Sequence, residues 1–121
     1  MSDRRVVPRE VLHFKTSDGR DPFEEWLNGL KDMRAWARIE QRINRVRMGN
    51  FGVYASLGDD VYELKIDYGP GYRIYFGQDD GAVVLLLCGG DKSTQRADIK
   101  QAKAYWHIYR TRRHAELHEE A

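Results

Sequence analysis

The sequence has little cysteine and no long apolar run, and these two absences exclude several classes of protein. Cys88 is the single cysteine among 121 residues, so an internal disulfide framework is impossible and we expect a reducing compartment. The longest apolar run, Ala82 to Cys88, is far shorter than the ~20 residues that cross a bilayer, and the N-terminus lacks the apolar stretch of a signal peptide. We therefore expect a cytoplasmic protein without a membrane partner, and Cys88 as a buried core thiol.

Histidine and cysteine are also too sparse for a recognisable metal site. The four histidines, His13, His107, His114 and His118, form no HExxH pattern. His114 and His118 are spaced to share one helix face, but their charged surroundings favour an ordinary surface pair. The phosphate-binding loop pattern of nucleotide-binding proteins is absent as well. We expect neither a metal nor another cofactor, and a ribonuclease mechanism based on paired histidines is hard to build from this sequence.

Charge is nearly balanced in total but unevenly distributed along the chain. The net charge is +1, and with 41% hydrophobic and 32% charged residues the composition is that of an ordinary globular protein, one domain over residues 1–121. Basic residues concentrate in residues 31–50 and 91–113, whereas acidic residues gather in residues 18–25, at residues 79–80 and near the C-terminus. A local basic surface attracts polyanions, although a merely solvated helix face would show the same pattern.

Capping residues and apolar spacing predict two helices in the first half of the chain and one at its end. Asp21 and Pro22 begin the first helix, because Asp is a favoured N-cap and Pro a favoured first helical residue. Its apolar residues recur at the spacing of one buried face: Phe23, Trp26, Leu27 and Leu30. Asp32 is expected to cap the second helix, which Gly49 ends. The last helix is expected over about residues 94–110.

Alternating or continuous apolar segments predict the strands. The expected strands are Val6–Lys15, Val61–Asp67, Tyr72–Phe76 and Ala82–Cys88, with residues 51–58 as a glycine-punctuated connection. The continuous apolar character of the last strand indicates a central position. The predicted class is α+β, with a small antiparallel-rich twisted sheet, two N-terminal helices and one C-terminal helix.

Two cations are expected to face each other across one hairpin. If Val61–Asp67 and Tyr72–Phe76 pair symmetrically around the turn Tyr68–Gly71, Lys65 lies opposite Arg73. Like charges directly opposed on a sheet destabilise it. The arrangement therefore points to an anion that belongs between them, such as a phosphate of nucleic acid.

The same hairpin is expected to have one apolar core face and one open polar face. Side-chain alternation places four residues on the polar face: Glu63, Lys65, Arg73 and Tyr75. Tyr75 would offer a ring there for stacking on an unpaired base. The alternative is a solvated face on which Glu63 neutralises a neighbouring cation.

A third cation, Lys92, lies in the segment Gly89–Ser93. The two glycines of this segment would allow close approach of the backbone, and the helix just beyond would present unpaired N–H groups to an anion. The alternative is a simple turn capped by Ser93 or Thr94, with Lys92 in solvent.

Three segments together resemble the RelE/ParE superfamily of toxins, and within it the HigB-like, phage-derived addiction module killer branch. They are Tyr62–Lys65 (YELK), Gly71–Phe76 (GYRIYF) and Leu85–Gln95 (LLLCGGDKSTQ), and the likeness extends from Asp21 to Trp106. The resemblance implies a RelE-like microbial-ribonuclease fold and a type II toxin–antitoxin function. Such toxins cleave mRNA, usually in the ribosomal decoding site, and a cognate helix-turn-helix antitoxin neutralises them.

The resemblance also implies roles for the cations and Tyr75 in metal-independent cleavage, in which the ribose 2′-OH attacks the adjacent phosphate. Arg73 is expected to stabilise the transition state, since a guanidinium grips phosphate oxygens bidentately, and Lys92 to be the second phosphate ligand or the acid. Lys65 is expected to be the base, because the like charge of Arg73 disfavours its protonated form. Tyr75 is expected to stack on a base or relay a proton. Arg73→Ala should then abolish toxicity while leaving the fold and antitoxin binding largely intact.

The basic helix faces are expected to bind RNA of the ribosome, or else an acidic antitoxin surface. The residues concerned are Arg38, Arg42, Arg45, Arg96, Lys100 and Lys103. DNA would be contacted only indirectly, through the antitoxin complex. Two alternative functions remain open, namely a ParE-like inhibitor that binds DNA gyrase without cutting RNA, and a non-toxic regulatory partner of a helix-turn-helix protein.

Overall fold

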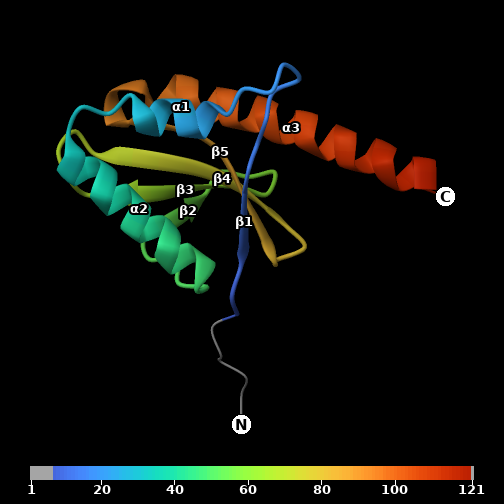
Figure 1. The fold of residues 1–121 in the computed structure, drawn as a ribbon, viewed down its shortest axis with the longest axis horizontal. Coiled ribbons are helices and arrows are strands. Elements are labelled where there is room, and N and C mark those ends of the chain that lie inside the picture. The colour runs from blue at the N-terminus through green and yellow to red at the C-terminus, as the bar shows by residue number, and fades with distance from the viewer. Residues whose placement is uncertain (1–6, 121) are drawn as a thin grey trace, which may run out of the picture.

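A five-stranded mixed sheet lies between helices on both of its faces. The computed structural model describes residues 7–120, in which three helices and one short 3₁₀ turn surround the sheet (Figure 1). The strands are β1 (Glu10–His13), β2 (Tyr54–Ser56), β3 (Val61–Ile66), β4 (Tyr72–Asp79) and β5 (Val83–Asp91). The helical elements are α1 (Pro22–Asn28), α2 (Met33–Arg47), the 3₁₀ turn η1 (Lys92–Thr94) and α3 (Gln95–Glu120). The predicted α+β class is confirmed.

Both N-terminal helices begin where the capping residues predict. The Asp21 carboxylate accepts a hydrogen bond from the backbone N–H of Glu24 (3.0 Å), and Pro22 is the first helical residue. Asp32 accepts one from the backbone N–H of Arg34 (2.9 Å). Each carboxylate satisfies an amide that has no partner inside its own helix.

The strand order is β1-β5-β4-β3-β2. Strands β3, β4 and β5 form the expected antiparallel series, with Lys65 opposite Arg73. β5 is internal as predicted, because β1 pairs in parallel with its other edge. β1 occupies only part of the segment expected to be a strand, whose first residue, Val6, lies outside the described residues. The sequence does not predict β2, a short edge strand that pairs with β3 inside the expected connection of residues 51–58.

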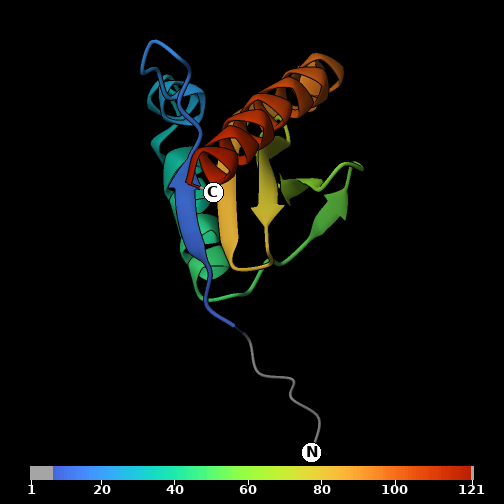
Figure 2. The ribbon, with the colours of Figure 1, turned by 90° about the vertical axis from the view of Figure 1, so that its right-hand side faces the viewer.

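Helices α1 and α2 lie on one face of the sheet and α3 lies on the other (Figure 2), and a hydrophobic core lies beneath the helices on each face. The core under α1 and α2 contains Ile74 and Phe76, as the alternation predicts. The core under α3 contains Tyr75 and Trp106. The prediction that this second face is open is therefore wrong, because α3 lies across it. Lys65, nearer to the hairpin turn, remains exposed on that face.

Three glycines of β4 and β5 make room for the helices that cover the sheet. A Cβ atom at Gly77 would lie 2.2 Å from the ring of Trp106, and one at Gly89 would lie 2.1 Å from the ring of Trp26. Gly89 and Gly90 belong to β5, and Gly90 faces the first turn of α3. The prediction that they form a ligand-binding loop is wrong, since they admit side chains of the protein itself.

Helix α3 is longer than predicted and projects past the sheet (Figure 1). Three of its basic residues pair with aspartates beneath it: Lys103 with Asp59 (4.0 Å) and Arg110 with Asp60 (3.5 Å) of the turn before β3, and Arg113 with Asp79 (3.6 Å) at the end of β4. Such exposed pairs contribute little to stability, but they neutralise part of the basic surface. Neither α3 nor any other helix in the described part of the chain is apolar over enough residues to cross a membrane.

Gly77→Ala should destabilise the protein, because the added methyl group would collide with the buried indole of Trp106. Overpacking of this kind costs about 1–3 kcal/mol, which urea unfolding followed by circular dichroism will measure. Gly29→Ala is the matched control, since a Cβ atom there meets only backbone atoms, at 3.4 Å and 3.5 Å. Equal stability of the two variants would contradict this packing.

Candidate functional site

The three predicted cations of the hairpin and the segment after β5 line one cavity. Its volume is about 480 Å³, and it lies beside the turn that joins β3 to β4. The lining residues are Arg42, Val53, Lys65, Asp67, Gly71, Arg73 and Lys92; we call this cavity the cationic pocket. Lys65, Arg73 and Lys92 come from β3, β4 and η1, so the strand pairing brings together charges that are remote in sequence.

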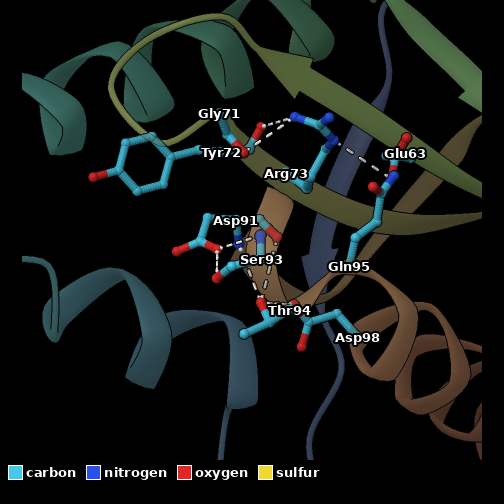
Figure 3. Close-up of polar contacts among 9 residues, drawn as sticks. All are labelled: Glu63, Gly71, Tyr72, Arg73, Asp91, Ser93, Thr94, Gln95 and Asp98. Atoms are coloured by element: carbon cyan, nitrogen blue, oxygen red, sulfur yellow. Dashed lines mark hydrogen bonds and ion pairs between the residues drawn. The ribbon is translucent and has the colours of Figure 1, made fainter.

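Arg73 lines the cationic pocket although its side chain is only 12% exposed. Its Nη1 donates to the carbonyl oxygens of Gly71 (3.1 Å) and Tyr72 (3.4 Å), and its Nε lies 3.7 Å from Oε1 of Glu63 (Figure 3). Its Nη2 makes no hydrogen bond to any residue that the structure describes. The guanidinium is therefore held by the hydrogen bonds of Nη1 and by the ion pair near Nε, and its Nη2 donors remain for an anion.

Glu63 is the buried counter-charge of Arg73. The residue is 2% exposed, and its Oε1 accepts a hydrogen bond from Nε2 of Gln95 (2.7 Å) (Figure 3). Gln95 is the first residue of α3, so the start of this helix helps to satisfy the carboxylate. Glu63 thus neutralises a neighbouring cation, as the alternative interpretation holds, but it does so in a buried ion pair and not on a solvated face.

Lys65 and Lys92 border the cationic pocket as exposed side chains. Gly71 lies between Arg73 and Lys92 with φ +80°, and a Cβ atom there would be 3.3 Å from Nη1 of Arg73 and 3.7 Å from Cβ of Lys92. Glycine accepts both this left-handed backbone and this close approach. The turn backbone at Gly71 therefore passes close to both Arg73 and Lys92.

Arg42 connects three backbone segments at one edge of the pocket. The sequence does not predict this role. Its Nη1 donates to the carbonyl oxygen of Lys65 (2.6 Å), and its Nη2 donates to those of Phe51 (3.0 Å) and Val53 (3.1 Å). These bonds tie α2 to β3 and to the segment before β2. Burial lowers the pKa of the Arg42 guanidinium from its ordinary value. The prediction of an RNA-binding residue is wrong for Arg42, because both of its terminal nitrogens already donate to backbone carbonyl oxygens and its Nε is buried.

Tyr75 and Cys88 are core residues beneath α3. Tyr75 has no exposed surface, and its hydroxyl finds no hydrogen-bond partner among the described residues. Burial, followed by the nearby charge of Glu63, raises the pKa of Tyr75. A ring in this position cannot stack on an RNA base, so the stacking role predicted for Tyr75 is wrong. Cys88 is buried as expected, and burial raises the pKa of its thiol to about 12.

Of the six residues predicted to bind RNA, four are exposed: Arg38, Arg45, Arg96 and Lys100. The guanidinium of Arg38 lies over the ring of Tyr68, 4.5 Å from its centroid. Lys103 is half-buried and pairs with Asp59, which leaves it less suited to a polyanion than the other members of the set.

Asp67 and Val53 also line the cationic pocket, and the sequence predicts neither of them as a site residue. Asp67 follows β3, is exposed, and makes no hydrogen bond or ion pair with any described residue. Because Lys65 and Asp67 are two residues apart, side-chain alternation could have placed both on one face. Val53 is 68% exposed, and no signal indicates it, because β2 itself is not predicted.

A larger groove lies elsewhere and contains groups that can bind a metal. It has a volume of about 830 Å³ and runs along β1 between α1 and α3. His13, Asp21 and Glu24 each place one ligand atom there within 4.8 Å of the others, a cluster that the sequence does not predict. Nδ1 of His13 already lies 2.8 Å from Oδ2 of Asp21, so a direct hydrogen bond accounts for this arrangement.

Glu63→Ala should destabilise the protein, because it leaves the mostly buried charge of Arg73 without its partner. Removal of one member of a buried ion pair costs about 3 kcal/mol, measurable as a lower urea midpoint. Glu116→Ala removes an exposed carboxylate from α3 and should change the stability by less than about 0.5 kcal/mol. If Glu63→Ala lowered the free energy of unfolding no more than Glu116→Ala does, the result would contradict the structural importance of the ion pair.

Comparison with known proteins gives a relative for the chain. No family model matches the sequence. Over 81 residues the chain is 56% identical to an uncharacterized protein of Haemophilus influenzae, and the alignment covers 67% of this chain and 82% of the relative. The chain therefore belongs to the same family as that Haemophilus influenzae protein.

Proposed function

We propose that the protein has a RelE-like fold and is an mRNA endoribonuclease of the HigB-like kind, the toxin of a type II toxin–antitoxin pair. The observation that supports this proposal is the convergence of Lys65, Arg73 and Lys92 on the cationic pocket. Like charges repel one another on a sheet, so their gathering is best explained by a bound anion. A phosphodiester of RNA is such an anion.

Arg73 is suited to stabilise the transition state of 2′-OH attack, in which negative charge builds up on the phosphoryl oxygens. Its guanidinium is held by Gly71 and Glu63 before any substrate binds. Preorganised donors of this kind need no reorganisation when charge develops, which is the main source of electrostatic catalysis. Lys92, exposed at the border of the pocket, would protonate the leaving 5′ oxygen.

Exposed basic residues lead away from the pocket on two sides. On α2, Arg42 lines the pocket, and Arg38 and Arg45 lie about one helical turn before and after it. On the other side, Arg96 and Lys100 follow Lys92 at four-residue spacing. A single RNA strand that follows both rows would pass its backbone through the cationic pocket.

The proposal implies a cytoplasmic protein with three kinds of partner, namely mRNA, the ribosome and a cognate helix-turn-helix antitoxin. The decoding site of the ribosome presents mRNA as a single strand, which is the form that the cationic pocket would accept. The exposed basic residues would contact RNA phosphates of the mRNA or of the ribosome, with strong salt dependence. DNA would be met only through the antitoxin complex.

Expression without an antitoxin should stop growth and cleave mRNA, and Arg73→Lys should remove both effects. Lysine keeps the charge that neutralises Glu63 but lacks the bidentate fork, so the fold should persist while cleavage falls about 10²–10³-fold. Growth curves and sequencing of RNA 5′ ends after brief induction measure this. Arg73→Ala is a poorer test than the sequence suggests, because it also leaves Glu63 buried and unpaired.

Arg34→Lys, on the exposed first turn of α2, is the control and should remain toxic. Full toxicity of a stably folded Arg73→Lys protein would refute the assignment of the site. DNA damage signalling without mRNA cleavage would instead indicate a gyrase inhibitor, and unimpaired growth would indicate a regulatory partner.

Arg96→Ala combined with Lys100→Ala should weaken RNA binding and flatten its salt dependence. Each phosphate contact to a single strand contributes about 0.7 to the slope of log K against log salt, so the double variant should lose about 1.4. Fluorescence anisotropy with a single-stranded RNA at several salt concentrations measures the slope. Arg110→Ala with Arg113→Ala removes the same charge from residues already paired with aspartates, and an equal loss there would argue against a specific RNA path.

A further inference from the structure

An unpaired carboxylate in a pocket of cations requires an explanation. Asp67 lines the cationic pocket together with Lys65, Arg73 and Lys92, yet it makes no hydrogen bond or ion pair within the described part of the chain. An acidic group there repels the phosphate that the cations attract. A pocket that served only to bind an anion would bind it better without Asp67.

We propose that Asp67 is the general base that accepts the proton of the attacking ribose 2′-OH. This inference rests on the proposed ribonuclease function, and it moves the role of base from Lys65 to Asp67. A base must be unprotonated before the reaction begins. An ordinary aspartate is ionised at neutral pH, whereas an ordinary lysine is protonated.

The other groups that could accept a proton near the pocket are already engaged. Glu63 is buried and bound by Gln95, and Tyr75 is enclosed beneath α3. Asp91 accepts a hydrogen bond from the backbone N–H of Ser93 (2.8 Å) as the cap of η1. No histidine lines the cationic pocket. Asp67 is therefore the one exposed carboxylate among the residues that line it.

The proton balance of the reaction closes with two side chains of the pocket. Asp67 takes the 2′-OH proton while the 2′ oxygen forms a bond to phosphorus, and Arg73 stabilises the negative charge that develops on the phosphoryl oxygens. The bond from phosphorus to the 5′ oxygen breaks, and this oxygen takes a proton from Lys92. The products are a 2′,3′-cyclic phosphate and a 5′-hydroxyl, after which solvent removes the proton from Asp67 and restores that of Lys92.

Asp67→Asn tests the inference, because the amide has the same size but cannot accept the proton. Cleavage of one mapped mRNA in a purified translation reaction should fall about 10²–10⁴-fold, and Asp67→Glu should recover part of the activity. Binding of a single-stranded RNA that is 2′-O-methylated throughout should be unchanged or tighter. Asp80→Asn is the control, since Asp80 is exposed in the β4–β5 turn with φ +54°, which Asn tolerates, and it should cleave like the wild type.

A modified substrate separates the base from the acid. A sulfur atom in place of the 5′ oxygen at the mapped linkage leaves without protonation, so this RNA should restore cleavage by Lys92→Ala. Because 2′-OH deprotonation is still needed, it should not restore cleavage by Asp67→Asn. Rescue of Asp67→Asn by the sulfur substrate would overturn the assignment.

The remaining outcomes distinguish this inference from the proposed function. If the wild type cleaves no RNA, the proposed function fails and the inference fails with it. If the wild type cleaves and Asp67→Asn cleaves within about threefold of it, well short of the 10²-fold loss expected for a base, only the inference fails. Parallel loss of cleavage and binding in Asp67→Asn would also overturn it, since that result would show a role in binding the RNA.

Discussion

The buried ion pair between Arg73 and Glu63 is the interaction on which the site depends. A carboxylate that is 2% exposed is costly to bury unless it is paired and hydrogen-bonded. Glu63 has both kinds of partner, with Nε of Arg73 at 3.7 Å and Nε2 of Gln95 at 2.7 Å. The pair connects β3 to β4, and the bond from Gln95 connects it to the start of α3, so the Nε side of the guanidinium lies against Glu63. The guanidinium of Arg73 therefore has two roles: its charge pairs with Glu63 within the fold, and its remaining N–H groups are fixed donors in the cationic pocket.

The position of α3 explains how one face of the sheet serves two purposes. Over most of that face the helix buries Tyr75 and Trp106, and Gly77 and Gly90 let it approach the strands closely. Near the hairpin turn the same face remains uncovered, and there Lys65 is exposed. Lys92, in the 3₁₀ turn that precedes α3, lies at this uncovered end. The core beneath α3 and the cationic pocket therefore lie side by side on one face of the sheet. The start of α3 marks the boundary between them.

Local signals predicted much of the fold and part of the site. Asp21 and Asp32 cap helices as expected because capping depends on the two or three residues that follow. Lys65 and Arg73 are opposed as expected because a short turn between alternating strands determines the register. Side-chain alternation predicts the correct face of the sheet for Tyr75. It does not predict that Tyr75 is in the core, because alternation does not show which helix covers that face. Arg42 was assigned to the surface, because the carbonyl oxygens it binds lie in other elements.

The sequence by itself determined the three helices, four of the five strands, the hairpin register and the presence of three cations in the segments that line the pocket. These properties follow from hydrogen bonds and side-chain spacing over a few residues. Only the tertiary structure decided that Glu63 is buried against Arg73, that Gly89 admits Trp26, and that Asp67 lies unpaired among the cations. Those outcomes depend on which surfaces α1 and α3 cover, and helix packing is decided by contacts between residues far apart in the chain.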